Sequence, residues 1–274
     1  MNIGALVRRL IFSWPLHGVV ILVLTLLTQL GGLAYLLAVL LRRGWRGRLA
    51  VFLIAYIGLS IATLFVAPAL GKRALPCWFS LDTAPMYARH PIYCLANRTY
   101  VRSELKELGD ALSRDLARAG DPTSIQALDG GFPYFDWFPL LPHLSHRGGR
   151  SLDMALPYLD VQGQPTRATP SAIGYFVYEP PGADDRQPCR HLHHGWKTLR
   201  WDMPWLQGRQ TDLTLDWVKL RQIVRHFADS PHVSKILLEP HLADRLNYSH
   251  PKVRFQGCRA ARHDDHIHIQ MIRN

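Results

Sequence analysis

Two long apolar runs dominate the first quarter of the chain. The first occupies residues 17–41 and is interrupted only by Gln29 and by scattered Gly, Thr and Tyr residues, and the second occupies residues 49–70. Each run is longer than the roughly 20 residues that an α-helix needs to cross the hydrocarbon core of a bilayer. The pattern therefore predicts two transmembrane helices within residues 1–75, joined as a hairpin that anchors the rest of the chain.

A signal peptide and a buried core hairpin both fit these runs less well. A cleaved signal peptide has an apolar region of about 7–15 residues, which is shorter than either run. A buried hairpin in a soluble core would need a large partner layer, but residues 76–274 already carry a core pattern of their own.

Beyond residue 75 the periodicity becomes that of a domain of about 200 residues with its own core. Apolar residues recur at helical spacing in residues 103–119, with Ser103 as a candidate N-cap, and in residues 213–228. Because helices and strands do not alternate regularly, we expect an α+β fold in which helices flank a small antiparallel sheet. Strand-like runs occupy residues 124–128, 151–156, 173–178, 235–238 and 266–272.

The charges bear on the membrane topology. The segment between the two runs, residues 42–48, contains four Arg and one Trp. Membrane proteins retain positive charge on the cytoplasmic side, so we expect this turn inside the cell and both chain termini outside. Arg8 and Arg9 favour the opposite orientation, as do Lys72 and Arg73.

The net charge does not indicate nucleic-acid binding. Residues 1–70 contain six Arg and no Asp or Glu, so more than half of the formal charge of +11 lies in or beside the apolar runs. We therefore expect the inner membrane, and not a nucleic acid, as a partner.

The four cysteines all follow the second apolar run. An even number outside the membrane is typical of two disulfides in an oxidising compartment. The sequence allows three pairings, and the first two cysteines flank one short Pro-containing segment, which favours Cys77–Cys94 with Cys189–Cys258. Four buried free thiols are the alternative. No CxxC spacing is present, so a zinc site built on cysteines is not expected.

Histidine and aspartate residues form two groups with the spacing of metal ligands. His143, His146 and Asp153 form the first, and a pair of glycines allows a tight turn that carries Asp153 back beside His146. His266 and His268 form the second, and residues two apart in a strand point to the same face. Two imidazoles and one carboxylate around an ion, with one position left open, is the arrangement of a catalytic zinc site.

A family resemblance rests on these groups. HLSHRGGRSLDMAL (residues 143–156) and KVRFQGCRAARHDDHIHIQM (residues 252–271) resemble the motifs of the zinc peptidase superfamily of lysostaphin-type enzymes, D-Ala-D-Ala carboxypeptidases and hedgehog domains. Within it, the penicillin-insensitive murein endopeptidase branch is the most similar. The resemblance covers residues 98–274, and the apolar runs lie outside the family pattern.

The resemblance implies roles for particular residues. Zinc would be bound by His146, Asp153 and His268, with His143 as an outer group or an extra ligand. His266 would polarise the attacking water or stabilise the oxyanion. Asp265 stands where the D-Ala-D-Ala carboxypeptidase branch carries a glutamate, so the general base is either His266 or Asp265.

The sequence allows two interpretations for each of three further groups of residues. His191, His193 and His194 belong either to a polar loop beside a disulfide or to a second metal site. Residues 129–142 form either a wall or lid over the site or a simple corner. The tryptophans either line a groove or belong to the core, and they are Trp137, Trp196, Trp201, Trp205 and Trp217.

These features together predict a membrane-anchored zinc peptidase in the periplasm of a bacterium. Its expected substrates are peptidoglycan stem peptides, and the expected bond is the crosslink from D-Ala to a diamino acid. A catalytically silent zinc-containing domain that binds the wall or a partner is the alternative, and a peptidase acting on ordinary proteins is a third possibility.

Overall fold

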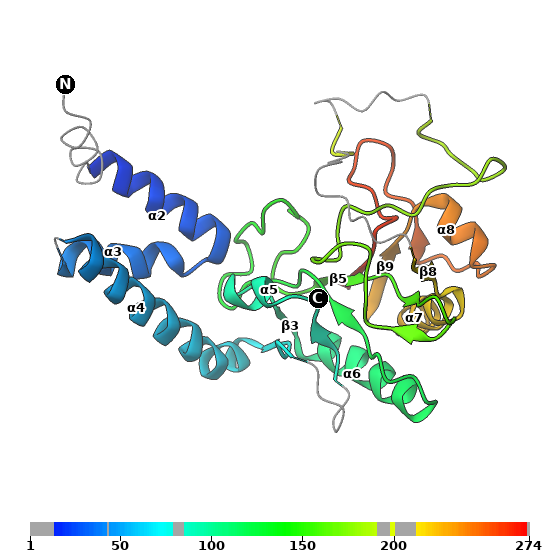
Figure 1. The fold of residues 1–274 in the computed structure, drawn as a ribbon, viewed down its shortest axis with the longest axis horizontal. Coiled ribbons are helices and arrows are strands. Elements are labelled where there is room, and N and C mark those ends of the chain that lie inside the picture. Colours follow the sequence, from blue (N-terminus) through cyan, green and yellow to red (C-terminus); the bar gives the residue numbers. More distant parts are fainter. Residues whose placement is uncertain (1–13, 43, 79–84, 191–197, 201–211, 273–274) are drawn as a thin grey trace.

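We analysed a computed structural model that describes residues 14–42, 44–78, 85–190, 198–200 and 212–272 of the chain. Figure 1 shows an N-terminal group of helices that extends to one side of a mixed α+β domain. The α+β class expected from the sequence is confirmed.

The first apolar run does not form one continuous helix. It is divided into α2 (Trp14–Thr28) and α3 (Gly31–Leu41), which lie side by side and run in opposite directions (Figure 1). Gln29, at the break, has a φ of 66° in the left-handed region, which ends α2 and reverses the chain. The second run forms α4 (Trp45–Val66), which continues into the short 3-10 helix η1 (Ala67–Leu70).

Close packing explains why the chain reverses here. A Cβ atom on Gly32 would lie 1.8 Å from the hydroxyl oxygen of Thr25, and one on Gly31 would lie 2.6 Å from that of Thr28. Only glycine allows α3 to approach α2 so closely. The two threonine hydroxyls bond back to the carbonyl oxygens of Ile21 and Leu24, so they leave no unpaired polar group in this apolar contact.

Among the described residues, one helix is long and apolar enough to cross a bilayer. It is the 26-residue segment Trp45–Leu70, and almost none of its apolar window is buried. With 15 and 11 residues, α2 and α3 are shorter than a full span. The structure thus contains one candidate membrane helix, and the expected hairpin of two spans is not confirmed.

The domain is built on a six-stranded sheet with the order β10-β9-β11-β5-β4-β2. Its central pairs are antiparallel, as expected, but both edge pairs, β10–β9 and β2–β4, are parallel. The strands are β2 (Tyr87–Ala88), β4 (Gln126–Ala127), β5 (Ser151–Ala155), β9 (Val233–Leu237), β10 (Val253–Arg254) and β11 (His266–Met271).

Two smaller sheets complete the strand pairing. The chain leaves α4 and enters the domain through β1 (Lys72–Ala74), which pairs with β3 (Tyr100–Arg102). A three-stranded sheet has the order β7-β6-β8 and contains β6 (Tyr158–Leu159), β7 (Pro165–Thr166) and β8 (Thr214–Leu215).

Two amphipathic helices pack their apolar residues into the core beside the sheet. They are α6 (Ser103–Arg118) and α7 (Trp217–Asp229), and the shorter α5 (Pro91–Leu95) and α8 (Pro240–Arg245) complete the domain. The expected helix 103–119 is confirmed, but its N-cap is Arg102 and not Ser103. The expected helix 213–228 begins later, because Asp216 accepts a bond from the amide of Lys219 as N-cap.

Several further expectations are resolved. The predicted disulfides Cys77–Cys94 and Cys189–Cys258 are both present. Residues 173–178 form no strand, because Gly174 and Phe176 both have positive φ, of 84° and 72°. Trp217 packs against the core and Trp137 is 69% exposed, whereas Trp196, Trp201 and Trp205 lie outside the described residues.

Candidate metal centre

The centre of the sheet brings Asp153 and His268 together. Asp153 lies in β5 and His268 in β11, and the antiparallel register places the two residues directly opposite each other. Both side chains point to the same face, and Asp153 Oδ1 lies 2.7 Å from His268 Nδ1. The other nitrogen of this imidazole, His268 Nε2, is buried without a hydrogen-bond partner among the described residues.

His146 reaches the same point from the turn before β5. Gly148 and Gly149, with φ of 70° and 68°, form the tight turn that the sequence predicts. The carbonyl oxygen of Gly130 lies 2.7 Å from His146 Nδ1 and fixes the ring. His146 Nε2 then lies 3.1 Å from Asp153 Oδ1 and 3.2 Å from His268 Nδ1. Three candidate ligand atoms thus meet at one buried point.

His143 lies on the other side of the same carboxylate. Its Nδ1 is 3.2 Å from Asp153 Oδ2 and 3.1 Å from Asp129 Oδ2, but without the alignment of a hydrogen bond. Ligand atoms of His143, His146 and Asp153 all lie within 4.8 Å of one another, and this group could hold a metal ion. The side chain of His143 is 20% exposed, whereas its Nδ1 atom, like His146 and Asp153, is buried, so His143 is the member of the cluster nearest to solvent.

His266 and Asp265 form a pair beside this cluster. Asp265 Oδ1 lies 2.5 Å from His266 Nδ1, and Asp265 Oδ2 accepts the backbone N–H of Phe176. Both oxygens of Asp265 are therefore engaged away from the cluster. His266 Nε2 instead faces the cluster, 3.6 Å from Asp153 Oδ1. Of the two residues considered for proton handling, His266 is the one whose free atom points into the site.

The charges of the cluster depend on one another. Burial acts to raise the pKa of Asp153, but His146 and His266 hold it well below its usual range. Burial acts to lower the pKa of His266, but the carboxylates of Asp153 and Asp265 raise it to about 9. Burial lowers the pKa of His268 to about 4. Without an ion, the site thus combines an ionised carboxylate, a cationic His266 and a neutral His268.

Two site residues, Asp129 and Tyr175, were not predicted, and a third, His263, belongs to the second histidine group of the sequence but had no predicted role. Asp129 is buried, accepts two bonds from Arg98 at 2.6 and 2.7 Å, and has its pKa lowered to about 2 by His143 and Arg98 despite burial. Tyr175 donates its hydroxyl to Asp153 Oδ2 at 2.7 Å. His263 is buried 5.0 Å from His266, centroid to centroid, and burial beside the other imidazoles holds its pKa well below its usual range.

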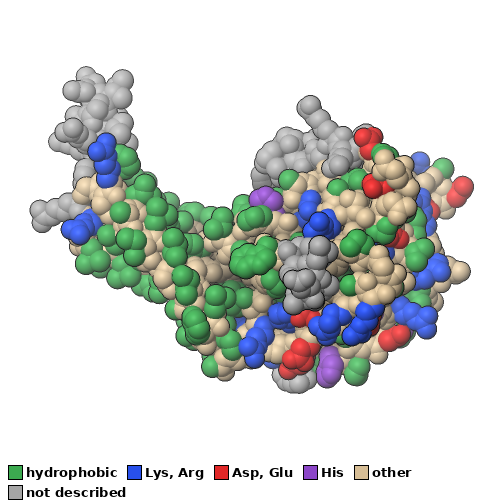
Figure 2. Space-filling view, turned by 60° about the horizontal axis from the view of Figure 1, so that its bottom comes forward, with side chains coloured by type: hydrophobic (Ala, Val, Ile, Leu, Met, Phe, Trp, Pro, Cys, Tyr) green, Lys and Arg blue, Asp and Glu red, His purple; other side chains and the backbone are tan. Residues whose placement is uncertain are grey.

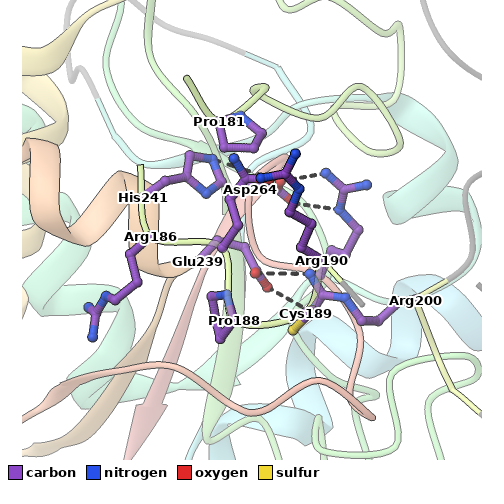
Figure 3. A pocket seen from close by; sticks show the side chains of 11 residues that line it. Pro181, Arg186, Pro188, Cys189, Arg190, Arg200, Glu239, His241 and Asp264 are labelled. Carbon is purple, nitrogen blue, oxygen red and sulfur yellow. Dashed lines mark hydrogen bonds and ion pairs between the residues drawn. The ribbon is translucent and has the colours of Figure 1, made fainter. Parts of the chain in front are cut away.

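A pocket of about 230 Å³ lies next to the segment that carries His263 and Asp265 (Figure 3). Its carboxylates are held by arginines, because Arg200 binds Glu239 with two bonds and Arg262 binds Asp264 with two. Glu239 also accepts the backbone N–H of His263. These ion pairs hold the segment before β11 in place and so position His266.

Some predicted site residues cannot be placed. His191, His193 and His194 lie outside the described residues. No protein-family model matches the chain, and a search of curated proteins finds no match either.

Proposed function

We propose that this chain is a membrane-anchored, zinc-dependent peptidase that hydrolyses amide bonds in peptidoglycan. One observation carries the proposal: a carboxylate-bound imidazole, His266, turns its free nitrogen toward a buried group of three or four candidate metal ligands. A structural metal site needs no such pair, because protein ligands close all its positions and no water is activated there.

The donor atoms fit zinc. Ligands at about 2.0–2.1 Å from a tetrahedral zinc ion lie roughly 3.3 Å apart. His146 Nε2, His268 Nδ1 and Asp153 Oδ1 are separated by 2.7–3.2 Å, close to that spacing. Imidazole and carboxylate ligands without thiolate are those of catalytic zinc sites. His146, Asp153 and His268 would hold the ion, with His143 at the open side.

The chain's own residues then manage the proton. A bound zinc ion supplies Lewis acidity, which activates water and polarises the carbonyl of the scissile amide. Asp265 keeps a proton of His266 on Nδ1, so Nε2 is the atom that faces the reaction. Once a bound cation favours the neutral imidazole over the cationic one, Nε2 would accept a proton from the attacking water and would later donate it to the leaving amine. The amide of Phe176 fixes Asp265 and thereby the plane of the imidazole.

The location and the substrate follow from separate observations. Two disulfides favour an oxidising compartment, and the candidate helix Trp45–Leu70 favours a membrane, which together support a domain in the periplasm at the inner membrane. The resemblance to murein endopeptidases supports stem peptides as substrates and the crosslink from D-Ala to a diamino acid as the bond cut.

The test combines zinc content with product release from purified sacculi, using the full chain in detergent. We expect the unchanged chain and the control His232→Ala, which alters an exposed histidine, to bind zinc and cleave crosslinks. His266→Ala should retain zinc but lose activity by about 10²–10⁴-fold. Zinc binding without any cleavage by the unchanged chain would contradict the proposal and favour a silent zinc-containing domain.

A further inference from the structure

Helix α4 has two chemically different faces. Tyr56, Ser60 and Thr63 follow one another at helical spacing and form a polar stripe from the middle of the apolar run onward. The opposite face carries large apolar side chains that are strongly exposed: Ile54, Ile57, Ile61 and Phe65, at 73%, 57%, 52% and 78%. This second face is the one available to lipid.

The domain covers the polar stripe. The Tyr56 hydroxyl donates to the carbonyl oxygen of Leu95, and the side-chain amide of Asn97 donates to Tyr56 and Ser60. Thr63 bonds to the hydroxyl of Tyr100. Inside a bilayer every polar group needs such a protein partner. The domain therefore lies beside the second half of α4, over about 10 Å of its length between Tyr56 and Thr63, and not merely beyond its end.

A second contact joins the hairpin of α2 and α3 to the domain. Gln29, at the tip of that hairpin, accepts the backbone N–H of Tyr134 through its side-chain oxygen at 3.0 Å. Lys72, just after η1, donates to the carbonyl oxygens of Phe132 and Tyr134. The loop that starts at Phe132 is thus fixed to the hairpin at Gln29 and to the start of β1 at Lys72.

The segments that make these contacts expose apolar side chains to the outside. We name these exposed apolar side chains, which lie on α5 and on residues 135–144, the junction surface. Phe135 and Trp137 stack on each other with ring centroids 5.5 Å apart, and both are more than half exposed. Figure 2 shows hydrophobic side chains that cover the helices and continue onto the adjoining edge of the domain. The junction surface consists of Ile92, Leu95, Phe135, Trp137, Leu141 and Leu144.

We infer that the junction surface is immersed in the leaflet that holds the second half of α4. The inference rests on the membrane anchoring proposed above. Leu95 is exposed beside Tyr56, and Phe135 follows the residue bound to Gln29, so the junction surface continues the lipid-facing surface of the helices at the same depth. Aromatic side chains such as Trp137 favour the membrane–water interface.

This placement brings the candidate metal site close to the bilayer. His143, the partly exposed member of the cluster, stands between Leu141 and Leu144 of the junction surface in the sequence. The His143 side of the cluster therefore lies at the membrane surface.

Depth measurements on the reconstituted full chain test the inference. A spin label is attached to single introduced cysteines in phospholipid vesicles: Phe65→Cys on α4, Leu95→Cys and Trp137→Cys on the junction surface, and Val161→Cys as the control. Val161 is 70% exposed on the turn after β6, which pairs with β8 on the side of the domain away from the helices (Figure 1). Collision rates are measured with oxygen, which enters lipid, and with a water-soluble nickel chelate.

We expect the ratio of oxygen to nickel collisions to be several-fold higher at positions 65, 95 and 137 than at position 161. If positions 95 and 137 behave like 161 while 65 remains in lipid, the anchor holds and the inference is wrong. The inference is also wrong if positions 95 and 137 are shielded from both reagents, because protein then covers them. If position 65 also behaves like 161, the membrane anchoring itself has failed.

Discussion

Asp153 and His268 face each other across the central strand pair, with the carboxylate oxygen 2.7 Å from the imidazole nitrogen. The hydrogen-bonding register of β5 and β11 fixes this approach, so the backbone, and not a flexible loop, sets the distance between two of the candidate ligands. Asp153 also faces His146 and His143, one on each oxygen atom. It is the one residue that contacts every other candidate ligand.

This central position makes Asp153→Asn the sharpest test of metal binding. The substitution keeps the shape of the side chain but removes the charge that an ion and three imidazoles share. We expect zinc affinity to fall by more than about 100-fold, the upper end of what loss of an outer partner costs. Zinc competition titration measures the effect. Asp184→Asn, which alters an exposed aspartate, is the control, and equal zinc affinity in both variants would exclude Asp153 as a ligand.

Tyr175 acts on the same carboxylate from the loop of residues 173–178. Its hydroxyl donates to Asp153 Oδ2 and its ring packs edge-on against His143 and His266, so it orients the carboxylate from outside the proposed ligand set. We expect Tyr175→Phe to weaken zinc binding by about 10-fold, as loss of an outer hydrogen bond does. Tyr248→Phe is the matched control, because it removes a tyrosine–aspartate bond outside the site. An equal loss in both variants would mean that general destabilisation is the cause.

Part of this site was predictable from the sequence, because rules that act between residues a few positions apart determine where its side chains lie. Alternation within a strand puts His266 and His268 on one face, and two glycines allow the turn between His146 and Asp153. Both rules act over a few residues, and the structure agrees with them. The central antiparallel strands and the two amphipathic helices follow from periodicity in the same way.

The remaining site residues depend on long-range contacts. Asp129 and Tyr175 reach Asp153 from loops that carry no periodic signal, and the segment around Tyr175 resembles a strand in its sequence. The reversal at Gln29 lies inside a long apolar run, whose hydropathy indicates only that the run is long enough to cross a bilayer. It depends on the close packing of Gly31 and Gly32 against two threonines, which becomes visible only in three dimensions.

That reversal changes the expected membrane topology. His17, near the start of α2, lies with its Nε2 3.2 Å from a guanidinium nitrogen of Arg48, so α2 begins at the same end of the bundle as α4. If α4 crosses the membrane, residue 14 lies on the side of the basic turn, opposite the domain.

We expect cysteines introduced at the start of α2 and at the start of α4 to react alike in intact cells. Trp14→Cys and Trp45→Cys should resist a membrane-impermeant thiol reagent until the inner membrane is opened, because both lie on the cytoplasmic side. Val161→Cys in the domain should react at once. Labelling of position 14 together with position 161 in intact cells would instead support two full spans. It would contradict the arrangement in which the chain reverses at Gln29 and both ends of the α2–α3 hairpin lie on one side.

The last prediction concerns the stability of the domain, away from the metal site. Lys219 on α7 is buried, and its ammonium group contacts Asp121 at 2.8 Å, the carbonyl oxygen of Ser124 at 2.9 Å and the hydroxyl of Thr123. Burial lowers the pKa of Lys219 despite these partners. Burial acts to raise the pKa of Asp121, but Lys219 and Thr123 lower it overall.

The sign of the pH effect follows from Asp121. Its pKa is lower in the folded chain than the ordinary value of 3.8, so its stabilising effect is present above about pH 4 and is lost as the pH falls through the folded pKa. We expect Asp121→Asn to reduce the free energy of unfolding by about 3 kcal/mol at neutral pH, because it leaves Lys219 buried without its counter-ion. The difference from the unchanged chain should shrink below pH 4.

Thermal and denaturant unfolding of the detergent-solubilised chain at several pH values measures this difference. Asp115→Asn removes an aspartate from an exposed pair with Arg118 and should change the stability by less than about 1 kcal/mol. Adding Lys219→Met to Asp121→Asn should recover most of the loss, because no buried charge then remains. A loss of stability that does not depend on pH and that Lys219→Met does not reverse would show that Asp121 acts through its bonds to residue 123, and not through the ion pair.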